Sequence, residues 1–199
     1  MSVPTRIGGF GGDDGFRAAV RGFDAVLDAT HPYAATMSER AARLCAETGT
    51  PHLRLARPPW PVEPKWHRHP TLDAAADALP SGARVLLTVG RGGAAPFLGR
   101  NLRLWARRVD PATDLPGLTW LVGRPGDVGS ETDLMRRLAI GHLVTKNAGG
   151  AGRAKLDAAT ASGVAIHVVD RPPPVLGEET HDIDRAEAFL RAHADRRRA

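Results

Sequence analysis

The sequence predicts an α/β fold with two parallel sheets, because one pattern of strand, loop, helix and strand occurs twice and a further apolar strand separates the copies. The first copy runs from the apolar segment Ala25–Thr30 through a loop and a helical pattern over about residues 36–48 to the strand-like His52–Arg57. Gly49 stands where this helix should end, since the residue just past a helix often takes the left-handed conformation that glycine adopts most easily.

The second copy has the same parts in the same order. The apolar segment His142–Thr145 is followed by a loop, a helical pattern over about residues 153–161, Gly163 and the strand Ala165–Asp170. Strand, helix and strand in this order are typical of a right-handed parallel crossover. The likeness indicates that one unit is used twice, although chance alignment of a common pattern remains the alternative.

The remaining elements complete two Rossmann-like halves. Further strands are expected at about residues 6–7, 85–89, 103–109 and 118–122, and further helices at about 72–79, 131–140 and 186–193. The turn residues Pro80–Gly82 mark the best boundary. We therefore expect a partial N-terminal domain over residues 1–80, a C-terminal domain over 81–195 with five parallel strands, and a basic tail over 196–199. Three strands make a thin first sheet.

Composition excludes several classes of protein. Hydrophobic residues make up 42% and charged residues 25% of the 199 residues, which is ordinary globular usage. Apolar runs fall short of the roughly 20 residues that span a bilayer. The single cysteine, Cys45, excludes an internal disulfide and recurs at helical spacing with apolar residues, so a core position and a cytoplasmic location are expected.

The charge distribution and the histidines argue against two further functions, nucleic-acid binding and metal binding. The net charge is +5, but three arginines stand in the tail and aromatic residues are few, so nucleic-acid binding is disfavoured. His67 and His69 flank Arg68 on a proline-rich connector without an evident third ligand, so no metal site is predicted.

Four loops follow predicted strands and could bind a ligand: residues 8–12, 30–33, 90–93 and 146–150. Ligands of parallel sheets lie beyond the carboxyl ends of strands, and glycine-rich, cationic loops admit anions close to backbone N–H groups. Lys146 carries this interpretation furthest, since it opens a loop that leads into a helix. Plainer alternatives stay open: the 8–12 cluster could be a tight turn, and His31, before Pro32, could be hydrogen-bonded scaffolding.

At these loops the sequence resembles the precorrin-6A reductases of cobalamin biosynthesis. The matching segments are RIGGFGG, VLDATHPYAATMS, PHLRLARPPW, GR before APFL, and VTKNAGG through AKLDAA to VVDRP, spread over about residues 6–174. The resemblance implies a two-domain reductase that holds NADPH and precorrin-6A, a polycarboxylated tetrapyrrole, in an interdomain cleft. Hydride transfer then reduces one carbon–carbon double bond of the macrocycle.

The resemblance also assigns roles to residues. On the cofactor side it places Gly9, Gly11, Thr30, His31 and Pro32, and on the substrate side Arg91, Lys146, Asn147, Gly149 and Gly150. By residue type alone, His31 and Tyr33 are the candidates for the catalytic group that donates the proton after the hydride.

Two departures from the family pattern keep alternatives open. Ala148 stands where family members usually have serine, and the family's N-terminal strand, glycine loop and helix before GGFGG have no counterpart, which makes the first domain incomplete. Truncation is the preferred explanation; a non-catalytic tetrapyrrole- or anion-binding protein is the alternative. A cobalt-precorrin-6A reductase and a dinucleotide-dependent reductase of another acidic metabolite are further alternatives. NADH instead of NADPH, and the oligomeric state, also stay open.

Overall fold

The computed structural model describes residues 4–90, 92–110, 113–174 and 176–194. The chain divides into unit 1, residues 1–58 with 172–199, and unit 2, residues 59–171. The boundary expected at Pro80–Gly82 is therefore not where the chain divides. Residues 59–80 supply an edge strand to the second sheet, and the C-terminal segment returns to the first. The expected basic tail, residues 196–199, lies outside the described residues.

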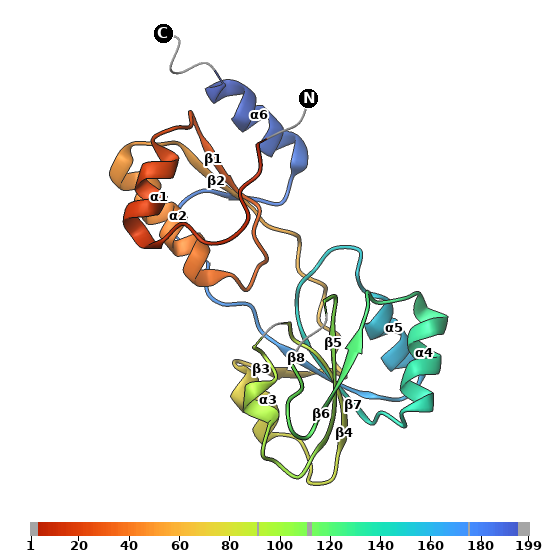
Figure 1. The fold of residues 1–199 in the computed structure, drawn as a ribbon. Helices are drawn as coiled ribbons and strands as arrows, with labels where there is room; N and C mark the ends of the chain where they lie inside the picture. The colour runs from red at the N-terminus through yellow and green to blue at the C-terminus, as the bar shows by residue number, and fades with distance from the viewer. Residues whose placement is uncertain (1–3, 91, 111–112, 175, 195–199) are drawn as a thin grey trace. The chain divides into compact units, whose positions relative to one another are not determined.

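Unit 1 contains a parallel three-stranded sheet in the order β1-β2-β9. Its elements are α1 (Gly12–Val20), β1 (Val26–Asp28), α2 (Ala35–Thr48), β2 (His52–Leu55), β9 (Glu179–Thr180) and α6 (Ile183–His193) (Figure 1). The first strand–helix–strand copy is thus confirmed as β1, α2 and β2. Gly49 ends α2 in the left-handed conformation, with φ 66°.

The prediction of a strand at Arg6–Ile7 is wrong. These residues form no strand, and the Ile7 side chain is 96% exposed. The third strand of the sheet comes instead from the other end of the chain, where Glu179 and Thr180 align with Arg54 and Leu55 of β2. An extended segment becomes a strand only where a neighbour offers backbone hydrogen bonds, and β9 occupies the free side of β2.

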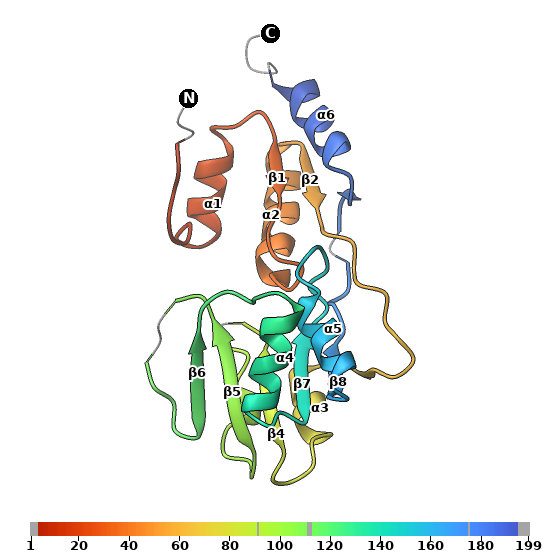
Figure 2. The same ribbon diagram turned by 90° about the vertical axis from the view of Figure 1, so that its right-hand side faces the viewer.

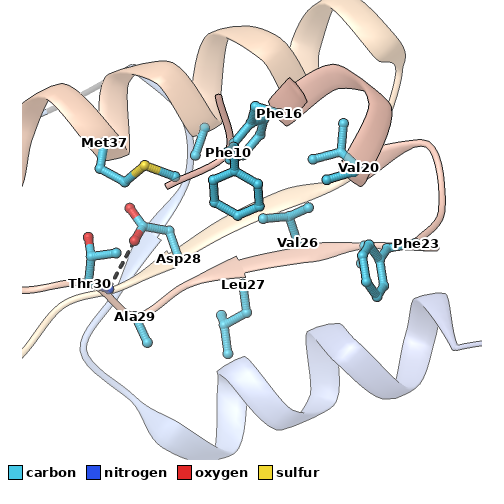
Figure 3. Close-up of a pocket in the computed structure, with 13 residues that line it drawn as sticks. Phe10, Phe16, Val20, Phe23, Val26, Leu27, Asp28, Ala29, Thr30 and Met37 are labelled. Atoms are coloured by element: carbon cyan, nitrogen blue, oxygen red, sulfur yellow. Dashed lines mark hydrogen bonds between the residues drawn. The ribbon is translucent and has the colours of Figure 1, made fainter. Parts of the chain in front are cut away.

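The core of unit 1 lies on the α1 and α2 side of its sheet. Phe16 and Val20 from α1 are buried together with Leu44 and Cys45 from α2. Helix α6 covers the opposite side (Figure 3). Cys45 is a core residue as expected, and its burial raises the pKa of the thiol to about 11, so the group is a poor nucleophile at neutral pH.

Unit 2 contains a parallel six-stranded sheet in the order β3-β8-β7-β4-β5-β6. Its elements are β3 (His67–His69), α3 (Leu72–Asp77), β4 (Arg84–Thr88), η1 (Ala95–Phe97), β5 (Arg103–Arg108), β6 (Leu118–Val122), α4 (Val128–Arg137), β7 (His142–Lys146), α5 (Ala154–Ala161) and β8 (Ala165–Val169). All five strands expected in the second half are present and parallel, and the second copy is confirmed as β7, α5 and β8.

Helices cover both faces of this sheet, which explains its continuous apolar strands. Helices α4 and α5 lie side by side on one face, and α3 lies on the other (Figures 1 and 2). Val85, Leu86 and Leu87 of β4 are therefore fully buried, although they point alternately to opposite faces. Within the described ranges, no helix combines the length and the apolar character that crossing a membrane requires.

Two helices begin earlier than expected because an aspartate caps each of them. The Asp127 carboxylate accepts the N–H of Ser130 and starts α4 at Val128, not at Glu131. Asp182 accepts the N–H of Asp184 and starts α6 at Ile183. A side-chain oxygen at this position satisfies an N–H group that has no partner within the helix.

Candidate functional site

The sheet of unit 2 has one point at which its strand order reverses, between β4 and β7. From β4 the chain adds β5 and β6 on one side and later β7 and β8 on the other, and Thr88 of β4 aligns with Thr145 of β7. The loops over residues 90–93 and 146–150 therefore leave adjacent carboxyl ends. This is the position where open α/β sheets bind their ligands.

Two of the four candidate loops thus begin at neighbouring strand ends in unit 2. Lys146 ends β7 half-buried, and desolvation lowers the pKa of its ammonium group. Gly149 and Gly150 both take left-handed conformations, with φ 70° and 73°. In the neighbouring loop, a Cβ on Gly93 would clash with Val89. Arg91 lies outside the described residues.

Asn147 is buried, with 6% of its surface exposed, and its amide contacts the backbone of Trp60. The amide oxygen accepts the Trp60 N–H at 2.8 Å, and the amide nitrogen donates to the Trp60 carbonyl at 3.0 Å. The indole N–H of Trp60 donates to the carbonyl of Gly150 at 2.7 Å. The loop is therefore attached to a segment far away in the sequence.

Arg171 and Lys155 also contact this part of the chain, and sequence reasoning assigned no role to either. The Arg171 guanidinium donates to the carbonyls of Asn147 and Ala148. The Lys155 ammonium lies 4.6 Å from the centre of the Trp60 ring and donates to the Gly152 carbonyl. Burial lowers the pKa of Lys155 to about 8. The signals in the sequence are the isolated tryptophan between prolines at residues 58–61 and the family-like segments AKLDAA and VVDRP, which contain Lys155 and Arg171.

In unit 1, a second polar group of residues follows β1. The buried Asp28 carboxylate accepts the N–H of Thr30 at 2.9 Å, and the hydroxyls of Thr30 and Ser38 lie 3.2 Å apart. Hydrogen bonds from Ser38 and Thr30 and the charge of Arg54 outweigh the opposing effect of burial, so the pKa of Asp28 is lowered. Asp28 therefore orders the start of the 30–33 loop as an ionised carboxylate.

The loop that follows differs from residue to residue in exposure. The His31 side chain is exposed, and its Nδ1 accepts the N–H of Tyr33 at 3.2 Å. Pro32 is buried, and its carbonyl accepts a long bond from Arg54 at 3.4 Å. The accepting role of Nδ1 means that the neutral His31 ring carries its proton on Nε2.

A cavity of about 410 Å³ runs along β1 and brings together parts of two candidate loops. Phe10 and Phe16 pack edge to face at 4.8 Å on its α1 side, while Asp28 and Thr30 form its polar end (Figure 3). Gly8, Gly11 and Gly12 have positive φ values, and a Cβ on any of them would meet open space. The volume of this cavity falls within the range of small-molecule sites, about 300–1,000 Å³.

His67 and His69 have further histidines beside them. His69 Nε2 lies 3.0 Å from His167 Nδ1, His142 Nδ1 lies 3.1 Å from His167 Nε2, and the His67 ring stacks on that of His167. The nitrogens form a chain of pairs because His167 uses a different nitrogen for each neighbour. In the part of the chain that the structure describes, no group of three or more ligand side chains could hold a metal ion.

These features define the class of the protein: an α/β protein of the doubly wound type, with glycine-rich and cationic loops at the carboxyl ends of its strands. The chain belongs to the family described as "Precorrin-6x reductase CbiJ/CobK", which matches residues 1–191. It is accordingly a reductase, and its family membership implies a reduced nucleotide as the source of electrons.

Individual relatives agree with this family. The chain is 43% identical over 198 residues to a precorrin-6A reductase of Rhodococcus erythropolis, covering 94% of this chain and 79% of that protein. It is 44% identical over 177 residues to a precorrin-6A reductase of Mycobacterium tuberculosis, covering 85% and 72%. A solved structure described as CobK precorrin-6A reductase matches with a TM-score of 0.88 at 38% identity, over 96% of this chain and 80% of that one.

Proposed function

We propose that this chain reduces one carbon–carbon double bond of precorrin-6A in cobalamin biosynthesis, with NADPH as the electron source. The observation that carries the proposal is the position of the Lys146–Gly150 loop at the point where the strand order of unit 2 reverses. The family and the named relatives supply the reaction. We also propose that the protein works in the cytoplasm.

The residues of unit 1 fit a nucleotide. The glycine loop 8–12 leads directly into α1, where backbone N–H groups can meet phosphate, and the cavity along β1 offers aromatic and aliphatic walls. Asp13 and Asp14 in the first turn of α1 would repel phosphate if unpaired, but Asp13 contacts Arg40 and Arg43, and Asp14 contacts Arg17. Gly9, Gly11, Thr30 and Pro32 then border the cofactor, which supplies the hydride.

The loop at the reversal point in unit 2 suits the carboxylates of the substrate. Lys146 provides a cation, and the left-handed Gly149 and Gly150 turn the backbone of the loop three and four residues further on. Desolvation strengthens the attraction between Lys146 and an anion, because fewer water molecules screen the pair. We assign substrate carboxylate binding to Lys146, Gly149, Gly150 and Arg91.

The reaction also needs a proton. One carbon of the double bond receives the hydride and its neighbour a proton, so the macrocycle gains two hydrogens and NADPH becomes NADP⁺. We propose that the proton comes from His31 or Tyr33. Nδ1 of His31 accepts the Tyr33 N–H, so the neutral ring is not itself an acid. His31 would donate a proton only as the imidazolium, with a proton on Nδ1 in place of that hydrogen bond, whereas Tyr33 would donate the proton of its hydroxyl.

Replacing Lys146 by methionine tests the substrate-binding role. We expect the KM for precorrin-6A to rise at least about 30-fold, because removing one partner of a desolvated charge pair usually costs about 2 kcal/mol or more. The KM for NADPH should stay within twofold. Steady-state oxidation of NADPH measures both constants. Lys65→Met, which removes an exposed lysine of unit 2, is the matched control. An unchanged KM for precorrin-6A in Lys146→Met would contradict the assignment.

A double variant, His31→Ala with Tyr33→Phe, tests the proton donor. General acid catalysis typically contributes about 10²–10⁴-fold, so we expect kcat to fall by at least about 10²-fold. The KM for precorrin-6A should change little, since neither side chain is assigned to a carboxylate. Turnover at the wild-type rate would remove both residues from the acid role and point to water as the donor.

A further inference from the structure

Both connections between the two units are attached to the same loop of unit 2. The chain enters unit 2 at Pro59 and leaves it after Arg171. Trp60 therefore stands one residue inside the first connection, and Arg171 is the last residue before the second. Each of them binds the loop that contains Lys146, Asn147 and Gly150.

At the first connection, the Asn147 amide binds both backbone polar groups of Trp60, and we call this pair of hydrogen bonds the clip. The amide both accepts from the Trp60 N–H and donates to the Trp60 carbonyl, as a neighbouring strand would. Trp60 and Asn147 are each about 6% exposed, so without the amide both backbone groups of Trp60 lose a partner in a buried place. The indole bond to Gly150 adds a third point of attachment.

At the second connection, the Arg171 guanidinium reaches two successive carbonyls of the same loop. Its Nε donates to Asn147 at 2.8 Å and its Nη2 to Ala148 at 3.2 Å. A planar fork of donors can bind both carbonyls at once, whereas the single ammonium of lysine cannot hold this geometry. The backbone N–H of Asn147 donates to Val169, two residues before Arg171.

We propose that Asn147 is a positioning residue that acts through Trp60, so that binding of the substrate's carboxylates at the Lys146–Gly150 loop is coupled to both connections. The inference deepens the proposed function and rests on it for the identity of the ligand. A contiguous set of hydrogen bonds provides this coupling. The ligand binds the Lys146–Gly150 loop, and the loop is hydrogen-bonded to Trp60 at one connection and to Arg171 at the other. The amide of Asn147 orders the loop, and the ligand contacts its neighbours Lys146, Gly149 and Gly150.

The clip can be measured without any ligand, as the hydrogen exchange rate of the Trp60 amide in ¹⁵N-labelled protein. Loss of two buried hydrogen bonds should raise this rate at least about tenfold in Asn147→Ala. In Asn147→Asp, which keeps an acceptor for the Trp60 N–H, the exchange rate should lie between those of the wild type and Asn147→Ala. Asn101→Ala is the matched control, since the chain's other asparagine is exposed and binds Ser81 in unit 2. Equal Trp60 rates in wild type and Asn147→Ala would overturn the proposal.

Coupling is measured with precorrin-6A. Saturation should slow Trp60 exchange in the wild type and leave it unchanged in Asn147→Ala. Trp60→Phe keeps the peptide pair but loses the indole bond to Gly150, so its KM for precorrin-6A should rise about threefold or more, with kcat within twofold, as loss of one neutral hydrogen bond implies. An increased KM in Asn147→Ala alone, with Trp60→Phe at the wild-type value, would instead show direct contact and overturn the inference.

The proposed function and the role of Asn147 can be contradicted by different results. If wild-type protein does not reduce precorrin-6A, the proposed function is contradicted, while the ligand-free exchange rates still judge the clip. If reduction proceeds and the Trp60 amide exchanges alike in all variants, the clip is contradicted and the reductase assignment stands.

Discussion

Replacing Arg107 by methionine is expected to lower the free energy of unfolding of unit 2 by about 3 kcal/mol, the low end of the usual cost of breaking a buried ion pair, because Lys155 still attracts Glu131. Arg107 of β5 donates to the carboxylate of Glu131 at 2.6 Å, and Glu131 is only 2% exposed. The Gly126 N–H also donates to this carboxylate, and the charge of the buried Lys155 attracts it without a direct hydrogen bond to it. Urea unfolding followed by tryptophan fluorescence reports on unit 2 alone, because all four tryptophans lie within it.

The double variant Arg107→Met with Glu131→Gln separates loss of the charge pair from loss of packing. The amide oxygen introduced by Glu131→Gln would still accept from the Gly126 N–H, and no buried carboxylate would be left without its arginine. Lys155 would lose its attraction to Glu131 and its repulsion from Arg107 together. We therefore expect the double variant to be more stable than Arg107→Met alone, although it carries one more substitution. If the double variant is as unstable as the single one, packing of the arginine side chain explains the loss and the ion pair does not.

Acidification is expected to cost unit 2 about 3 kcal/mol of stability between pH 7 and pH 4, through its chain of histidines. Burial, and then the nearby His142, His67 and His69, lower the pKa of His167 from 6.5 to about 4. The folded form therefore binds fewer protons than the unfolded form within this range. The stabilisation is complete above pH 6.5 and is lost as the pH falls towards 4.

Replacing His167 by glutamine should flatten this pH dependence. The variant is expected to lose clearly less free energy of unfolding between pH 7 and pH 4.5 than the wild type, because the buried ring no longer takes up a proton. Burial also lowers the pKa of His69 and His142, so a smaller slope remains. His193→Gln, on α6 of unit 1, is the control and should keep the wild-type slope in tryptophan fluorescence. A wild-type slope in His167→Gln would contradict the account.

Much of the fold could be predicted because each parallel crossover produces a pattern in consecutive residues. Buried strands such as β4 are continuous apolar runs, and glycine marks the ends of α2 and α5. The elements that were missed depend on distant partners. The polar strand Glu179–Thr180 exists only because β2 offers it an edge, and β3 exists because β8 does. Neither carries a pattern of its own.

The candidate site divides in the same way. The loops after β1, β4 and β7 could be placed at strand ends from the order of elements alone. The strand order that makes the 90–93 and 146–150 loops neighbours was not evident, because pairing between β4 and β7 is not local. The contact between Trp60 and Asn147 joins residues 87 positions apart, so spacing could not reveal it. The same holds for His142 and His167, whose register across β7 and β8 brings the rings together.

Transfer of a labelled hydride tests the central claim most directly. Precorrin-6A is incubated with this chain and NADPH that carries deuterium in place of both hydrogens on C4 of the nicotinamide ring, and the product is analysed by mass spectrometry. We expect a reduced macrocycle with one deuterium from the cofactor and one hydrogen from solvent. Reduced product without deuterium, or no reduced product from folded protein that binds both compounds, would contradict the proposed reaction.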